Sequence, residues 1–290
     1  MSNSPSPATP ITSDSPRDSS STPFRVAALQ MVSTPDRERN LADAEGLIAQ
    51  AAGQGARLVL LPEYFCFMGH KDTDKLAIRE AYQDGPIQRF LAAAAKRHGV
   101  WVIGGTLPLK APEETRVLNT TLVFDPSGAE RARYDKIHLF SFEKGAESFD
   151  EARTIRPGAE VHTFDAPFGR VGLSVCYDLR FPELYRRMGD CALMVVPSAF
   201  TYTTGRAHWE TLLRARAVEN QCYVLAAAQG GQHENGRRTW GHSMLIDPWG
   251  EIVDVRDDNP GVVIGDIDLE RMAAVRASLP AWRHRVLDCP

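Results

Sequence analysis

The sequence has no cysteine pattern that would build a disulfide framework or a zinc site. Its five cysteines are an odd number, and no two of them stand in a C-x-x-C spacing. Disulfide-rich secreted domains and zinc ribbons depend on such paired cysteines. We therefore expect free thiols in the cytoplasm, with neither a metal nor another cofactor.

Long apolar runs and an excess of basic charge are absent as well. No stretch approaches the roughly 18 consecutive apolar residues that a transmembrane helix needs. Lys and Arg number 33 against 37 Asp and Glu, for a formal net charge of -4, which provides no field for nucleic acid or an anionic membrane. We expect no nucleic-acid partner and no membrane partner, and a small molecule as the ligand.

The first 22 residues lack the apolar segment of a secretory signal and are rich in Ser and Pro. Such a composition offers little apolar surface to bury, so we expect a disordered tail at 1–22. The remainder, 23–290, has the ordinary composition of a globular protein, with 43% hydrophobic and 24% charged residues across the chain. We expect it to form one domain.

The two halves of this domain repeat one order of elements. Each has apolar strands that alternate with amphipathic helices and then a hairpin around an Asp-Pro-x-Gly turn. In β-α-β units the helices cover one face of a sheet, so two such sheets can pack face to face with their helices outside. The prediction is an α/β fold, a four-layer α-β-β-α sandwich of two pseudo-repeated halves. The expected elements are 24–31, 36–56, 57–65, 86–99, 100–106, 119–125 and 130–140 in the first half, and 169–178, 182–189, 191–200, 208–221, 222–231 and 241–255 in the second.

Three titratable residues stand where apolar strands end. Glu63 ends "VLLPE", Lys136 lies near the end of "ARYDKIHL" and Cys176 ends "VGLSVC". Taken singly, they read as an ion-paired carboxylate, a solvated lysine and a small core residue. Because ligands gather at the carboxyl ends of strands in α/β sheets, the three together favour a catalytic site.

The sequence resembles the nitrilase superfamily of carbon–nitrogen hydrolases. "LLPEYF", "YDKIHLF" and "VCYDLRFPELY" are similar to its three triad motifs in the expected order. The resemblance implies a Glu-Lys-Cys triad of Glu63, Lys136 and Cys176, the sandwich fold, and homodimers or larger homo-oligomers. It also implies a second glutamate in "ESFDEARTIRPG", at Glu151, with Glu147 as the rival.

The chemistry follows from the residue types. A cysteine thiol becomes a nucleophile beside a base, and Glu63 is placed to accept its proton. The Lys136 ammonium and the backbone N–H of Tyr177 are the expected donors to the oxyanion that attack on an amide creates. The acyl group then rests on Cys176 as a thioester until Glu63 activates water.

Within the superfamily, 197–250 resembles the branch that contains deaminated glutathione amidase and ω-amidase. The first activity, release of cysteinylglycine and 2-oxoglutarate from deaminated glutathione, is the favoured expectation. The alternatives are ω-amidase acting on α-ketoglutaramate, an N-carbamoyl amino acid amidohydrolase and a nitrilase. The expected substrate-binding residues are Tyr177, Arg180, Phe200, Thr204 and Trp209. The segments 200–209 and 229–238 are expected to contact a dipeptide leaving group beyond the amide nitrogen.

Two other classes compete with this interpretation. A papain-like hydrolase would pair the thiol with His138, His208 or His242, although its local signature is absent. A binding or scaffold protein would have the fold without the chemistry, which the three intact motifs disfavour. Near the cysteine, Asp178 has a structural alternative, as a cap of the following turn.

Overall fold

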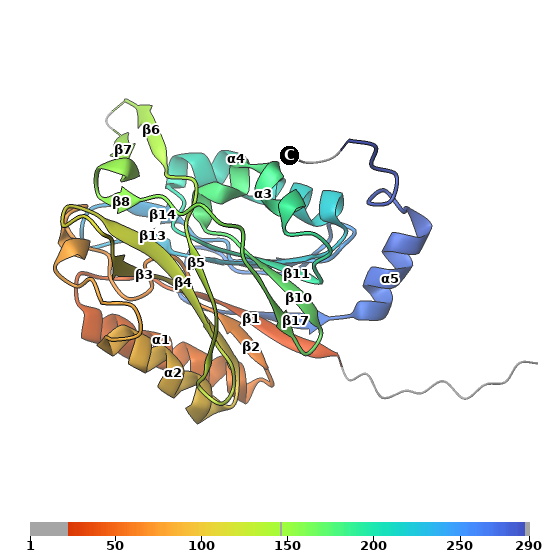
Figure 1. Cartoon of the computed structure of the whole chain (residues 1–290), viewed down its shortest axis with the longest axis horizontal. Coiled ribbons are helices and arrows are strands. Elements are labelled where there is room, and N and C mark those ends of the chain that lie inside the picture. Colours follow the sequence, from red (N-terminus) through yellow and green to blue (C-terminus); the bar gives the residue numbers. More distant parts are fainter. Residues whose placement is uncertain (1–22, 146, 288–290) are drawn as a thin grey trace, which may run out of the picture.

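Two β-sheets lie face to face between two layers of helices in this computed structural model, which describes residues 23–145 and 147–287 (Figure 1). The predicted four-layer sandwich of two repeated halves is confirmed. The predicted tail, 1–22, and Cys289 lie outside the described residues.

Both sheets follow one topology. Three parallel strands are succeeded in space by two antiparallel strands, giving the order β1-β2-β3-β4-β5 in the first sheet and β10-β11-β12-β15-β16 in the second. One antiparallel strand extends each sheet at the other edge, β17 beside β1 and β9 beside β10. The bounds in the first sheet are β1 Phe24–Gln30, β2 Leu58–Leu60, β3 Trp101–Lys110, β4 Val117–Phe124, β5 Glu130–Asp135, β8 Ile155–Arg156 (beside β4) and β17 Gly261–Ile267; in the second they are β9 Thr163–Ala166, β10 Gly169–Leu173, β11 Leu193–Ser198, β12 Tyr223–Ala228, β15 Met244–Ile246 and β16 Ile252–Val255.

The helices cover the outer faces of the sheets. In Figure 1, α1 and α2 lie against the first sheet, and α3 and α4 lie over the second. The bounds are α1 Arg37–Gly53, α2 Pro86–His98, α3 Pro182–Arg187, α4 Tyr202–Asn220 and α5 Leu269–Ser278, and two hairpins, β6 Ser141–Lys144 with β7 Glu147–Asp150 and β13 Gly230–Gln232 with β14 Arg238–Trp240, complete the fold. None of the helices in the described ranges is long and apolar enough to cross a membrane.

Two apolar cores hold the layers together. One lies between α1, α2 and the first sheet, and includes Leu41, Ile48 and Leu91. The other joins both sheets with α3 and α4, and includes Leu58 of the first sheet and Leu225 of the second. Burial of such side chains is the main stabilising contribution, about 1.5–3 kcal/mol for each large one. The interface between the two sheets is therefore buried as completely as the interface between the first sheet and its helices.

Several boundaries differ from the sequence prediction, and the strand expected at 169–178 ends at Leu173. The strand expected at 57–65 ends at Leu60, since Pro62 follows and Tyr64 has a positive φ of 59°. The strand expected at 130–140 ends at Asp135, just before Lys136. The helix expected at 208–221 begins earlier, because the side chain of Thr201 accepts a hydrogen bond from Thr204 N–H and caps α4.

Candidate active site

A buried cluster of charges joins Lys136 to two glutamates. Lys136 Nζ lies 3.0 Å from Glu63 Oε1 and 2.7 Å from Glu151 Oε2. The side chains of Lys136 and Glu63 are almost fully excluded from solvent. A lone ion in such a place would be very unfavourable, so the pairing is what allows three charges at the centre of the molecule.

Glu63 is held by donors on both of its oxygens. Oε1 also accepts from Asn119 Nδ2 at 2.9 Å, and Oε2 accepts from the backbone N–H of Ala199 at 3.0 Å. The backbone is fixed too, because Gln229, the residue after β12 of the second sheet, donates to Glu63 O at 3.0 Å. A Cβ at Gly105 of β3 would lie 1.9 Å from Leu61 O, so only glycine allows this close approach. The carboxylate therefore has one orientation, set by both sheets.

Cys176 begins a short 3₁₀ helix, Cys176–Arg180, that follows β10. Its φ is 51°, a left-handed conformation that costs a non-glycine residue on the order of 1–3 kcal/mol. Pro182 then occupies the first turn of α3, as the sequence predicts. The strained turn places the thiol in the same cavity as Glu63.

Asp178 ties this turn to the segment around Lys136. Its Oδ2 accepts from Val175 N–H at 2.9 Å and from the Tyr134 hydroxyl at 2.7 Å, and its Oδ1 accepts from His138 N–H at 3.0 Å. Tyr134 and His138 flank Lys136 in sequence, so one buried carboxylate sets the cysteine turn of the second sheet against the lysine of the first. The structural alternative for Asp178, a cap of this turn, is what the structure shows.

The histidines of the papain-like alternative are engaged elsewhere. His138 Nδ1 lies 2.7 Å from Asp178 Oδ1, and the ring stacks on Phe181 with centroids 3.7 Å apart. His208 Nδ1 lies 3.2 Å from Arg180 Nη1, and His242 Nδ1 lies 2.8 Å from Trp240 O. Within 23–145 and 147–287, no group of His, Cys, Asp and Glu side chains is arranged to hold a metal ion.

The second glutamate of the cluster is Glu151. Besides Lys136, it accepts from the Tyr64 hydroxyl at 3.0 Å and from Phe140 N–H at 2.8 Å. The rival, Glu147, belongs to β7, and its side chain lies outside the described part of the structure.

The charges shift every pKa in the cluster. Burial raises the pKa of Glu63, an effect that Lys136 partly offsets. Burial acts against the ammonium of Lys136, but Glu151 and Glu63 outweigh it and hold the pKa of Lys136 well above its ordinary value. Burial, and then the charge of Glu63, raises the pKa of Cys176 well above that of a free thiol. These shifts favour a neutral thiol at Cys176 beside a carboxylate of enhanced basicity at Glu63.

Two hollows meet at Cys176. The large cavity has a volume of about 430 Å³ and is lined by Glu63, Glu151 and Cys176 together with parts of 68–75, 140–150 and 199–239. The Arg180 pocket, of about 10 Å³, is lined by Phe140, Cys176, Tyr177, Arg180, Ala199, Phe200, Thr201 and Thr204. The two hollows share four residues, Phe140, Cys176, Ala199 and Thr201, so they adjoin at the thiol.

The structure brings together four of the five expected substrate-binding residues and separates the fifth. Tyr177, Arg180, Phe200 and Thr204 all line the Arg180 pocket. Trp209 lines neither hollow: it is 1% exposed, its indole N–H donates to His242 O at 2.8 Å, and its ring packs on Phe200. The expectation for Trp209 is corrected, because its place on the inner face of α4 makes it a core residue behind the pocket.

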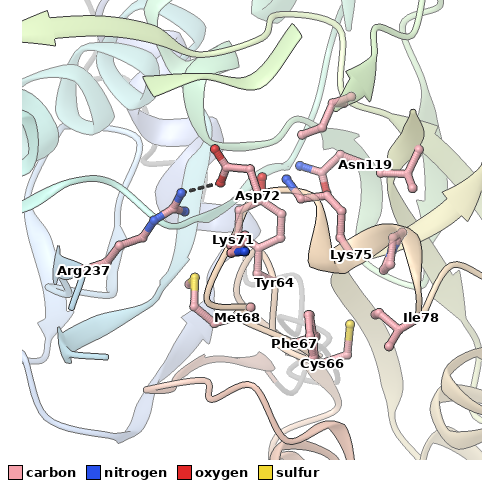
Figure 2. Close-up of a pocket in the computed structure, with 14 residues that line it drawn as sticks. Tyr64, Cys66, Phe67, Met68, Lys71, Asp72, Lys75, Ile78, Asn119 and Arg237 are labelled. Carbon is pink, nitrogen blue, oxygen red and sulfur yellow. Dashed lines mark hydrogen bonds and ion pairs between the residues drawn. The ribbon is translucent and has the colours of Figure 1, made fainter. Parts of the chain in front are cut away.

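Sequence reasoning missed three polar residues of this region, Asn119, Tyr64 and Lys75, and included a fourth, Arg237, only as part of 229–238. Asn119 and Tyr64 orient the two glutamates. Lys75 and Arg237 line the large cavity and also a smaller hollow of about 30 Å³ next to it, the Lys75 pocket, which Figure 2 shows. Asn119, a polar residue inside a predicted buried strand, carried a usable signal. The other three lie in irregular segments without periodicity.

Comparison with known proteins agrees with this geometry. The sequence model of the family described as carbon-nitrogen hydrolase matches residues 25–277. The chain belongs to the carbon–nitrogen hydrolase family. It is therefore a hydrolase of carbon–nitrogen bonds other than peptide bonds, and the predicted resemblance is confirmed.

Relatives with curated names lie on the predicted branch. The chain is 43% identical to a deaminated glutathione amidase of Synechocystis sp. over 271 residues, 91% of this chain and 98% of that protein. It is 38% identical to the human omega-amidase NIT2, over 92% of this chain and 96% of that protein. Among solved structures, the Caenorhabditis elegans NitFhit protein matches with a TM-score of 0.84 and 40% identity, over 91% of this chain and 65% of that chain.

Proposed function

We propose that the protein is an amidase in which Cys176 is the nucleophile, Glu63 the general base and acid, and Lys136 an oxyanion donor. The observation that carries the proposal is the contact of buried Lys136 with Glu63 and Glu151, the two glutamates that line one cavity with the thiol of Cys176. Glu151 keeps Lys136 charged and in place. Tyr177 N–H is the second proposed oxyanion donor.

Acylation begins as the thiol gives its proton to Glu63 and the sulfur attacks the amide carbon. The carbonyl electrons move to oxygen, where Lys136 and Tyr177 N–H stabilise the charge. Collapse breaks the C–N bond as Glu63 returns the proton to the leaving nitrogen. Because the thiol is neutral before the reaction, its proton must move to Glu63 while the sulfur attacks. The raised pKa of Glu63 favours this transfer.

Deacylation uses the same groups in the reverse order. Water attacks the thioester carbon while Glu63 takes a proton from it. The C–S bond breaks, the acid leaves, and Glu63 returns the proton to the sulfur. No cofactor is needed in this scheme.

The proposed substrate is deaminated glutathione, cleaved to 2-oxoglutarate and cysteinylglycine. The names of the relatives support it, and so does the shape of the site, where the Arg180 pocket offers a cation for the carboxylate of the acyl group. The large cavity leaves room for a dipeptide beyond the scissile bond. Binding of that dipeptide can be used to raise turnover as well as affinity.

A substrate panel on the purified protein tests this function. We expect kcat/KM for deaminated glutathione to exceed that for α-ketoglutaramate by roughly tenfold or more, which corresponds to about 1.4 kcal/mol of transition-state binding. Equal or reversed values would favour the ω-amidase activity that the human relative is named for. Turnover only of nitriles or N-carbamoyl amino acids would refute both.

Mass spectrometry after rapid quench tests the nucleophile. We expect an acyl adduct on Cys176 and none on the other cysteines, and no turnover by Cys176→Ala. An adduct elsewhere, or an active Cys176→Ala protein, would refute the assignment.

We also propose that the protein acts in the cytoplasm as a homodimer or larger homo-oligomer built from its 23–290 domain. The described cysteines, Cys66, Cys176, Cys191 and Cys222, are all free thiols, which a reducing compartment maintains. Analytical ultracentrifugation tests the assembly, and a monomer at all concentrations would refute it.

A further inference from the structure

Lys75 presents a cation to the large cavity without a carboxylate partner of its own. It lies in a short 3₁₀ helix, Asp74–Leu76, in the segment that follows β2. Its Nζ is 3.4 Å from Thr154 Oγ1 and 5.3 Å from the centroid of the Tyr64 ring. Among the described residues, no Asp or Glu oxygen lies within ion-pair distance of it. Burial lowers the pKa of Lys75, with the charges of Glu151 and Asp72 acting in the other direction.

Arg237 also lines the large cavity, and two contacts orient its side chain. Its Nη2 pairs with Asp72, as Figure 2 shows, and its guanidinium lies over the Phe149 ring at 5.4 Å. A guanidinium carries five N–H donors in a fixed plane, so the pair with Asp72 leaves others for a ligand. Within the described ranges, Asp72 pairs with Arg237, so Lys75 is the one of these two cations that has no ion pair.

These cations lie in the large cavity, on the side of Cys176 that does not include the Arg180 pocket. Lys75 and Arg237 line the large cavity and are not among the residues of the Arg180 pocket, whereas Arg180 lines only that pocket. The nucleophile is shared by both hollows. A substrate with Cys176 at its scissile carbon therefore meets one cationic group on each side.

We propose that Lys75 and Arg237 form a binding site for a carboxylate on the leaving group, so that the enzyme selects amides between a dicarboxylic acyl group and an amino acid or short peptide. The proposal rests on the proposed function and deepens it. With Arg180 receiving the carboxylate of the acyl group, the second site receives the terminal carboxylate of the leaving dipeptide. A leaving group without a carboxylate, such as ammonia, leaves this site unused.

The test compares deaminated glutathione with the same molecule in which the terminal carboxylate of the dipeptide is a primary amide. Release of 2-oxoglutarate is measured for both, so cleavage of the added amide does not contribute. We expect the wild-type protein to prefer the acid in kcat/KM by about ten- to hundredfold, the range that hydrogen bonds to charged groups give. In Lys75→Met the preference should fall to about threefold or less.

Lys71→Met is the matched control. Lys71 lies four residues away, is exposed, and lines the Lys75 pocket but not the large cavity. The same charge is removed, and we expect the acid-to-amide ratio of the wild type to persist. The ratio is independent of how much active protein each preparation contains.

The outcomes separate this inference from the proposed function. Equal turnover of acid and amide by the wild-type protein would overturn the inference while leaving the amidase activity established. Retention of the preference in Lys75→Met would also overturn it. Failure of the wild type to hydrolyse either compound would overturn the proposed substrate and the inference together. The wild-type comparison decides the matter even where Lys75→Met does not fold.

Discussion

Replacing Glu63 by Gln keeps the size of the side chain and removes the proposed base. General-base groups typically contribute 10²- to 10⁴-fold, so we expect kcat to fall at least about a hundredfold. The amide cannot take the proton of Cys176, and it cannot deliver one to the leaving nitrogen. Binding of substrate is affected less, because Arg180 and the far end of the large cavity are unchanged.

The structure also gives the cost in stability. Glu63 accepts from Lys136 and Asn119 on one oxygen and from Ala199 N–H on the other. A glutamine can present its oxygen to one side only, so its NH₂ group faces donors on the other side. One buried unsatisfied donor costs about 1–3 kcal/mol, which lowers the melting temperature by several degrees.

The thiol provides a third readout of the same variant. The charge of Glu63 is one of the causes that raise the pKa of Cys176, after burial itself. Removing this charge should lower the pKa of Cys176, so the pH dependence of alkylation by iodoacetamide should move to lower pH. A loss of activity below about tenfold, or an unmoved alkylation profile, would refute the assignment of Glu63 as the base beside the thiol.

Glu80→Gln is the matched control for these measurements. Glu80 is also buried, and it accepts hydrogen bonds from Ile87 N–H, Gln88 N–H and Gln88 Nε2 at the start of α2. It lines neither the large cavity nor the Arg180 pocket. We expect a comparable loss of stability with kcat within about twofold of the wild type.

Three further predictions concern pH, the core of the site and the N-terminal segment. Because burial raises the pKa of Glu63, kcat/KM should fall with decreasing pH along an acid limb above about 4.3, the ordinary value for glutamate; a limb at or below that value would contradict the raised pKa. Asp178→Asn puts an NH₂ group against two donors, so we expect a loss of about 2–4 kcal/mol in urea unfolding and a lower kcat; unchanged unfolding would show that Asp178 does not hold the cysteine turn. Removal of residues 1–22 should leave melting temperature and kcat within error, and a clear loss in either would show that this segment binds the domain.

The fold could be predicted because its pattern is repeated. Continuous apolar strands, amphipathic helices and Asp-Pro-x-Gly turns recur in the same order, and the sheet orders follow that repeat. The exact ends of the strands and helices were harder to predict from the sequence. The early end of β2 depends on the left-handed backbone of Tyr64, and the early start of α4 depends on the cap by Thr201, neither of which affects hydrophobic periodicity.

The site could be predicted only where a residue ends a strand. Glu63, Lys136 and Cys176 all follow strands; Glu63 and Cys176 line one cavity, and Lys136 lies behind it in contact with Glu63. Lys75 lies in a short connecting segment of the first half of the sequence, and Arg237 in one of the second half. Such segments have no hydrophobic periodicity from which the direction of a side chain could be predicted. The prediction for Trp209 was wrong because helical spacing does not tell which face of α4 lies toward the pocket and which lies toward the core.

The site is built from both halves of the domain, and this arrangement affects how easily Cys176 is oxidised. Glu63 and Lys136 come from the first sheet, Cys176 and Ala199 from the second, and the sulfur is buried where they meet. The thiolate is the form that peroxide attacks, and a free cysteine with a pKa of about 8.5 contains a few per cent of it at neutral pH. In the docked molecule the pKa of Cys176 is far higher, so its thiolate is much scarcer. We therefore expect the joined sheets to protect the proposed nucleophile from oxidation, and any opening of the two halves to remove that protection.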